Sequence, residues 1–143
     1  MIEKLLLSRT HWETMRLHVQ RCLPMEGCGL LAGIGDEVHE VFLIQNAERS
    51  PTRFRMDAQA QLKAFRDMEE RGLDLVGIFH SHPADHPSEA VSGNMPSATD
   101  IVEAAYPAVH VIWTRQAGKW NAQGFWLDGA EVRTVQLLAP GGE

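Results

Sequence analysis

Two histidines separated by one residue follow an apolar run in the middle of this chain. The run is Leu75-Val76-Gly77-Ile78-Phe79, and His80-Ser81-His82-Pro83 follows it directly. An apolar run of this length favours a strand, and successive side chains of a strand point to opposite faces. The spacing therefore predicts that both imidazoles project from the same side. Ser81 then points to the other side and has a structural role, while Pro83 ends the strand.

A serine and an aspartate follow downstream, in Pro96-Ser97-Ala98-Thr99-Asp100. Asp100, delivered by the next element, completes a His-His-Asp set with His80 and His82. Three nitrogen and oxygen ligands with a fourth position open to water are typical of a catalytic zinc site, because a structural site is closed by four protein ligands. The alternative interpretation is a polar strand end followed by a helix capping box, Ser97-x-x-Asp100.

A glutamate stands at the entrance to another predicted strand. Glu26 precedes an apolar segment punctuated by glycines, which runs from Gly27 to Gly35. Carboxylates are rarely buried without a partner, so this placement needs an explanation. Zinc lowers the pKa of a bound water towards ~7, and a nearby carboxylate can take the proton as hydroxide attacks a carbonyl. We therefore predict that Glu26 is a general base.

Taken together and in this order, the glutamate, His-Ser-His-Pro and Ser-x-x-Asp resemble the signature of the JAMM (MPN-plus) metallopeptidase family. The resemblance extends through three segments, Leu23–Gly33, Asn46–Leu62 and Leu75–Ala105. It implies one zinc ion per chain, held by His80, His82 and Asp100. It further implies that Glu26 moves the proton and that the hydroxyl of Ser97 stabilises the oxyanion of the tetrahedral intermediate.

The chain departs from the family between His82 and Asp100, where the connecting segment is longer than usual. The extra residues, Ala84–Met95, are polar and include proline and glycine. They predict a surface loop on the substrate side of the zinc cleft. A tolerated insertion is the alternative, because lengthening a loop costs little closure entropy.

Composition narrows the class of protein. The 143 residues fit one domain spanning 1–143, with 44% hydrophobic residues. The net charge of −6, without a basic run, argues against a nucleic-acid partner. No stretch approaches the ~20 apolar residues of a membrane span, and the first apolar run is too short for a signal peptide. Cys22 and Cys28 provide no disulfide framework and suit a reducing compartment, so we expect a cytoplasmic protein.

Three alternatives concern individual side chains and chemistries. Cys28 could be a nucleophile paired with a histidine, although a small buried apolar role is its default. His11 and His18 are expected to decorate one exposed helix face. A zinc deaminase would need His-x-Glu and Pro-Cys-x-x-Cys, whereas the motif here continues from His80 as Ser81-His82 and the sequence has no Cys-x-x-Cys.

The predicted elements form an α/β fold with a mixed, largely antiparallel sheet flanked by helices, and the family has such a fold, related to that of cytidine deaminases. Helices are expected from Ser8 or Thr10 to about Leu23, from Asp57 to Gly72, and from Ser97 to Pro107. Their buried stripes are predicted at Trp12, Met15, Val19 and Cys22 in the first helix, and at Leu62, Phe65 and Met68 in the second. Strands are expected at 5–7, 27–35, 38–45, 73–80, 109–114, 120–127 and 132–138.

The sequence therefore predicts a zinc metallopeptidase that hydrolyses an amide or isopeptide bond. The resemblance suggests a ubiquitin-like substrate with a Gly-Gly C-terminus, and a small chain such as this one favours a sulfur-carrier protein. Two alternatives stay open: a non-catalytic scaffold of the MPN-minus kind, and a small-molecule amidohydrolase with the same zinc centre. A homo-oligomer is compatible with either.

Overall fold

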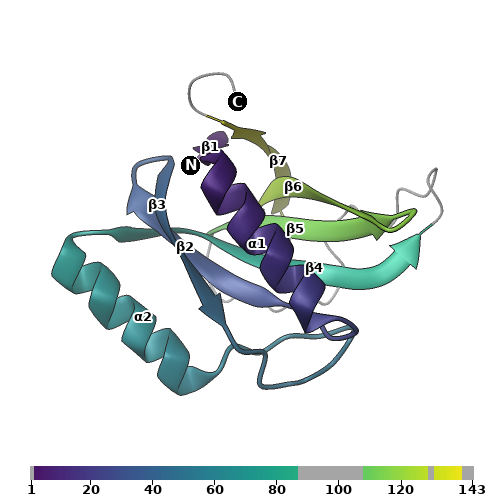
Figure 1. Ribbon diagram of the computed structural model, residues 1–143. Coiled ribbons are helices and arrows are strands. Elements are labelled where there is room, and N and C mark those ends of the chain that lie inside the picture. The colour runs from purple at the N-terminus through teal and green to yellow at the C-terminus, as the bar shows by residue number, and fades with distance from the viewer. Residues whose placement is uncertain (1, 87–107, 129–130, 140–143) are drawn as a thin grey trace.

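The computed structural model describes residues 2–86, 108–128 and 131–139. Figure 1 shows α1 crossing the middle of the sheet, with α2 at the lower left, away from α1. In chain order the elements are β1 (Lys4–Leu6), α1 (Arg9–Cys22), β2 (Cys28–Ile34), β3 (Glu37–Ile44), α2 (Ala58–Arg71), β4 (Asp74–His86), β5 (Ala108–Gln116), β6 (Lys119–Asp128) and β7 (Glu131–Leu138).

The strands form one sheet in the order β1-β3-β2-β4-β5-β6-β7, closed into a barrel where β1 meets β7. The pairs β1–β3, β1–β7 and β4–β5 are parallel and the others are antiparallel. The predicted mixed sheet is thus confirmed. The closure is new, since Lys4 pairs with Gln136 and no local pattern reveals a register between strands so distant in the sequence.

Helix α1 begins where the sequence predicts. The Ser8 side chain accepts a hydrogen bond from the His11 backbone N–H at 3.1 Å, and His11 Nδ1 lies 3.4 Å from the Ser8 N–H, which completes a capping box. Met15 and Val19 are fully buried on its inner side. The exposed face expected for His11 and His18 is wrong: His11 belongs to the cap, and the half-buried ring of His18 packs edge-on against Phe79.

Helix α2 has both predicted ends. Asp57 Oδ2 accepts a hydrogen bond from the Ala60 N–H at 3.0 Å, and Gly72 ends the helix in the left-handed conformation with φ 68°. Ala64 and Met68 are its buried residues, whereas Leu62, predicted to be buried, is 52% exposed. Leu62 lies two positions from Ala64, which is about 200° around a helix with 3.6 residues per turn, so it faces away from the sheet.

Strand β4 continues through Pro83 to His86, which corrects the prediction that Pro83 ends the strand. Its pairing with β5 shifts register between His82 and Asp85. A proline has no N–H to donate, and such a bulge tolerates it. The Pro83 carbonyl instead accepts a hydrogen bond from Arg115 Nε at 2.9 Å. The rest of the segment expected to be a loop, and the helix expected from Ser97, lie outside the described residues.

The side chains on the two faces of the sheet form separate cores. One core lies under α1: Leu5, Leu7, Met15, Val19, Leu31, Val38, Val76, Phe79, Val109, Val111, Trp113, Ala122 and Val135. The other lies under α2: Cys28, Leu30, Ala32, Ile44, Met56, Ala64 and Met68. Phe79 belongs to the first core, and Ile78 packs against the second. His80 and His82 therefore lie on the α2 side of β4. Neither helix in the described part of the chain is long and apolar enough to cross a membrane.

Candidate active site

The two histidines of β4 meet, as their spacing predicts. The Nε2 atoms of His80 and His82 are 3.3 Å apart. His80 is fully buried and His82 is half-buried. Two imidazole nitrogens on one tetrahedral zinc, each at 2.0–2.1 Å, are about 3.3 Å from one another. A hydrogen bond between one protonated and one unprotonated ring nitrogen has a similar length.

Two aromatic rings surround the imidazole of His80. Phe54 stacks on it, with 4.6 Å between the ring centroids and 21° between the planes. His110 of β5 meets it edge-on at 6.2 Å. His110 is 6% exposed and pairs with Ile78 across β4–β5. Neither Phe54 nor His110 was predicted from the sequence to belong to the site. What could have revealed His110 is the register of β4 and β5, since His110 lies two residues before Ile112, the strand partner of His80.

Glu26 comes close to the histidines in space. It lies just before β2 and is 2% exposed. A cleft of about 200 Å³ is lined by Glu26, Pro51, Thr52, His82, Pro83 and Ala84. The carboxylate predicted to be a base and one predicted ligand therefore line the same cleft.

The main chain next to Glu26 is fixed to β4 by Ser81. The Gly27 N–H donates to Ser81 Oγ at 2.8 Å, and the Ser81 N–H donates to the Gly27 carbonyl at 3.0 Å. Both residues are buried, and Ser81 is 0% exposed. The predicted structural role of Ser81 is confirmed, and its contact sets the distance between the strand of the histidines and the segment of Glu26.

Cys28 has the environment of an inert thiol. It pairs with His80 across β2–β4 and is fully buried. Burial raises the pKa of the Cys28 thiol to about 12, and its Sγ donates to the Ile44 carbonyl at 3.5 Å. A nucleophilic cysteine needs the thiolate, so this environment favours the small buried apolar role over the nucleophile.

The remaining predicted site residues, Ser97 and Asp100, lie outside the described residues. Over the ranges 2–86, 108–128 and 131–139, no three histidine, cysteine, aspartate or glutamate side chains gather closely enough to hold a metal ion. Two of the three predicted ligands thus come together, and the third belongs to the segment that is not described.

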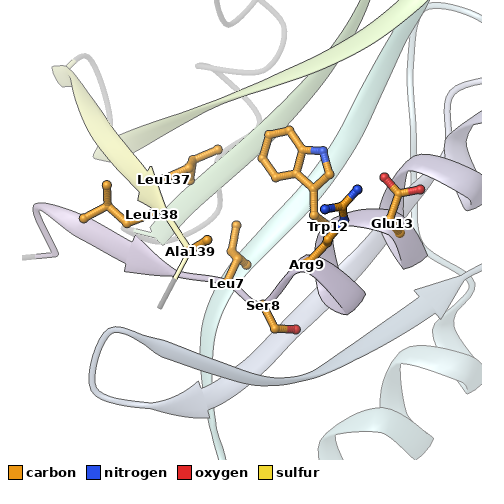
Figure 2. A pocket seen from close by; sticks show the side chains of 8 residues that line it. All are labelled: Leu7, Ser8, Arg9, Trp12, Glu13, Leu137, Leu138 and Ala139. Carbon is orange, nitrogen blue, oxygen red and sulfur yellow. The ribbon is translucent and has the colours of Figure 1, made fainter. Parts of the chain in front are cut away.

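A second hollow lies at the N-terminal end of α1. Its volume is about 370 Å³, and Figure 2 shows side chains of α1 on one side and the end of β7 on the other. Its lining consists of Leu7, Ser8, Arg9, Trp12, Glu13, Leu137, Leu138 and Ala139. None of the predicted site residues belongs to it.

Comparison with known proteins identifies a family. Residues 8–127 match the family of prokaryotic homologs of the JAB domain. A protein of Thermus thermophilus described as a "Probable TtuB-protein conjugate cleaving protease" is 38% identical over 127 residues, which cover 87% of this chain and 78% of that protein. The CysO-cysteine peptidase of Mycobacterium tuberculosis is 41% identical over 100 residues, covering 68% of this chain and 64% of its own length.

Solved structures share the fold. A protein of Desulfitobacterium hafniense, determined in solution, superposes with a TM-score of 0.80 at 31% identity, covering 97% of this chain and 94% of that one. A structure described as a JAMM metalloprotease-like zinc site superposes at 0.51 with 18% identity, covering 94% and 98%, and shows likeness of fold alone. The family match covers most of the chain, and the chain therefore belongs to the prokaryotic JAB-domain family, as its resemblance to JAMM proteins implied.

Proposed function

We propose that this chain is a zinc metallopeptidase that hydrolyses an amide or isopeptide bond at the Gly-Gly C-terminus of a ubiquitin-like or sulfur-carrier protein. The observation that carries the proposal is the cleft shared by Glu26 and His82, with the buried His80 beside it. A buried carboxylate beside two converging imidazoles is an arrangement that suits zinc-dependent hydrolysis.

The described part of the site fits zinc. The separation of 3.3 Å between the Nε2 atoms of His80 and His82 suits two ligands of one tetrahedral ion. We propose Asp100 as the third protein ligand. Zinc held there would polarise the scissile carbonyl and make a water molecule more acidic.

The side chains of this chain would move the protons. Glu26 accepts a proton from the water whose oxygen attacks the carbonyl carbon. It then gives that proton to the departing amine nitrogen as the C–N bond breaks, leaving a carboxylic acid and an amine. The hydroxyl of Ser97 donates a hydrogen bond to the carbonyl oxygen as negative charge develops there. The burial of Glu26 limits the solvation of its carboxylate by bulk water.

The names of relatives support the substrate class. One relative is described as cleaving TtuB-protein conjugates and another as a CysO-cysteine peptidase. A third, a desampylase of Pyrococcus furiosus, is 36% identical over 96 residues, covering 67% of this chain and 64% of that protein. The cleft has a volume of about 200 Å³, and glycine is the smallest residue that such a cleft could accept.

The test combines metal content with turnover of a carrier protein whose Gly-Gly end bears one additional amino acid. The purified chain should contain one zinc per molecule, and His80→Ala, His82→Ala and Asp100→Ala should each lose most of it. Glu26→Gln should keep zinc and lose about 10²–10⁴-fold in turnover, the usual range for acid–base catalysis. Ser97→Ala should keep zinc and lose about 10²–10³-fold.

Glu70→Gln serves as a matched control, since it makes the same chemical change on an exposed position of α2 and should leave turnover unchanged. Protein that takes up no zinc after reconstitution would contradict the proposal and favour a non-catalytic scaffold. If the zinc-loaded protein cleaves only small amides, the substrate class is a small molecule rather than a carrier protein.

A further inference from the structure

The side-chain amide of Asn46 makes four hydrogen bonds, all to main-chain groups. Its Nδ2 donates to the Glu26 carbonyl at 3.1 Å and to the Arg53 carbonyl at 3.0 Å. Its Oδ1 accepts from the N–H groups of Glu48 and Arg55, each at 3.0 Å. Asn46 is 9% exposed. Two donated and two accepted bonds use the whole capacity of an amide group, so both its position and its orientation are determined.

Those bonds fix the two segments that bring Glu26 and Phe54 to the histidines of β4. Arg53 and Arg55 are the neighbours of Phe54, so Asn46 fixes the backbone on both sides of the ring that stacks on His80. The bond to the Glu26 carbonyl fixes the main chain of the residue proposed as the base. The N–H of Glu26 is fixed from the same loop, because it donates to the Ser50 carbonyl at 2.8 Å.

We propose that Asn46 is a positioning residue, which holds Glu26 and the Phe54–His80 stack at a set distance from one another. The inference rests on the proposed function, because it assigns catalytic work to Glu26 and His80. It extends that function to a residue that touches neither metal nor substrate. A displacement of the order of 1 Å between base and ligand can cost about 10²-fold in rate, so the effect should appear in turnover.

The chemistry of the amide separates this role from simple loop stabilisation. Asn46→Asp has almost the same shape and keeps acceptors for the N–H groups of Glu48 and Arg55. It replaces the Nδ2 group, whose two donors reach Glu26 and Arg53, with a carboxylate oxygen. The variant therefore loses the bond to Glu26 and one bond within the loop, that to Arg53, and keeps the two loop bonds from Glu48 and Arg55.

The first experiment measures kinetics of the zinc-loaded protein. Asn46→Asp and Asn46→Ala should each lower kcat by about 10–100-fold, a larger factor than any rise in KM, because Asn46 itself does not line the cleft. Val135→Ala, a cavity variant in β7 of the other core, is the control for lost stability and should retain wild-type kcat at a temperature where all variants are folded.

The second experiment needs neither metal nor activity. In proton–carbon spectra of the metal-free protein, the stacked Phe54 ring should displace the ring-proton resonances of His80 upfield, with His80→Ala giving the assignment. Phe54→Leu removes the aromatic ring and sets the reference position. In Asn46→Asp most of the displacement should be lost. If Asn46→Asp does not fold, Phe54→Leu still tests the stacked half of the proposal and should lower kcat by about tenfold.

Folded Asn46→Asp with wild-type kcat and an unchanged His80 resonance would overturn the inference. Failure of the proposed function has a different signature, in which wild type and Glu26→Gln are equally inactive. In that case the His80 resonance still decides whether Asn46 holds Phe54 over the imidazole.

Discussion

Removing the hydroxyl of Ser81 offers a direct measure of the contact that joins the Glu26 segment to β4. In Ser81→Ala the Gly27 N–H loses the acceptor that lies 2.8 Å away. Ser81 is 0% exposed and Gly27 is buried, so water cannot easily replace the lost oxygen. The reciprocal bond from the Ser81 N–H to the Gly27 carbonyl does not involve the side chain and should persist.

The magnitude follows from the burial of the donor. A buried donor left without a partner costs about 1–3 kcal/mol. For a domain of this size each kcal/mol lowers the Tm by roughly 3–5 °C, so Ser81→Ala should melt roughly 3–15 °C below wild type. The assay is thermal and urea unfolding followed by circular dichroism. An unchanged m-value would show that the loss is one of stability rather than of compactness.

Ser50→Ala provides the matched control. It also removes a hydroxyl that accepts a backbone N–H, that of Thr52 at 3.1 Å, but this bond is exposed. Water can replace the Ser50 oxygen, so the free energy of unfolding should change by less than about 0.5 kcal/mol. Equal losses of stability in the two variants would refute the argument that burial of the Gly27 donor sets the cost.

Three further predictions concern other parts of the molecule. Because burial raises the pKa of Cys28 to about 12, the Cys28 thiol should resist alkylation at pH 8 in the folded protein and react fully in urea; rapid labelling of folded protein would contradict this. Gly29→Ala should abolish folding or cost more than about 4 kcal/mol, because its Cβ would overlap the Phe42 carbonyl oxygen and the Phe79 ring. Gly35→Ala meets open space and should cost only the roughly 1–2 kcal/mol of its positive φ. Comparable expression and Tm for both variants would be inconsistent with the packing. Burial lowers the pKa of His18 below 6.5, so the unfolded chain binds the proton more readily and stability is lost as the pH falls below about 6.5. His18→Gln should therefore show a smaller difference in Tm between pH 8 and pH 5 than wild type. An equal difference would assign the effect to other groups.

The parts of the fold that depend on local pattern were predictable. Helices begin at Ser8 and Asp57 and end at Gly72, where caps are expected, because capping depends on a few neighbouring residues. The shared face of His80 and His82 follows from the two-residue period of a strand. Leu62 was mispredicted because a helical pattern identifies an apolar side chain without showing how wide a stripe the sheet covers.

The parts of the site that depend on contacts between distant segments were not predictable. Phe54 reaches His80 from an irregular loop, and His110 reaches it from a strand that pairs in parallel with β4. Neither register nor loop path is encoded in the local alternation of polar and apolar residues. The assignments of Ser97 and Asp100 rest on the motif and remain predictions.

The pairing of β1 with β7 also constrains the order in which the chain can fold. Leu5, a fully buried core residue, lies in a strand that pairs with Leu137 near the other end of the described chain. During synthesis β1 would soon be followed by β3, with which it also pairs, but its other edge would have no partner until β7 had emerged. Such a distant contact has a high loop-closure cost and belongs late in folding. A nascent chain would therefore leave this edge of β1 unpaired until β7 has been made, a period in which it is open to aggregation or to capture by a chaperone.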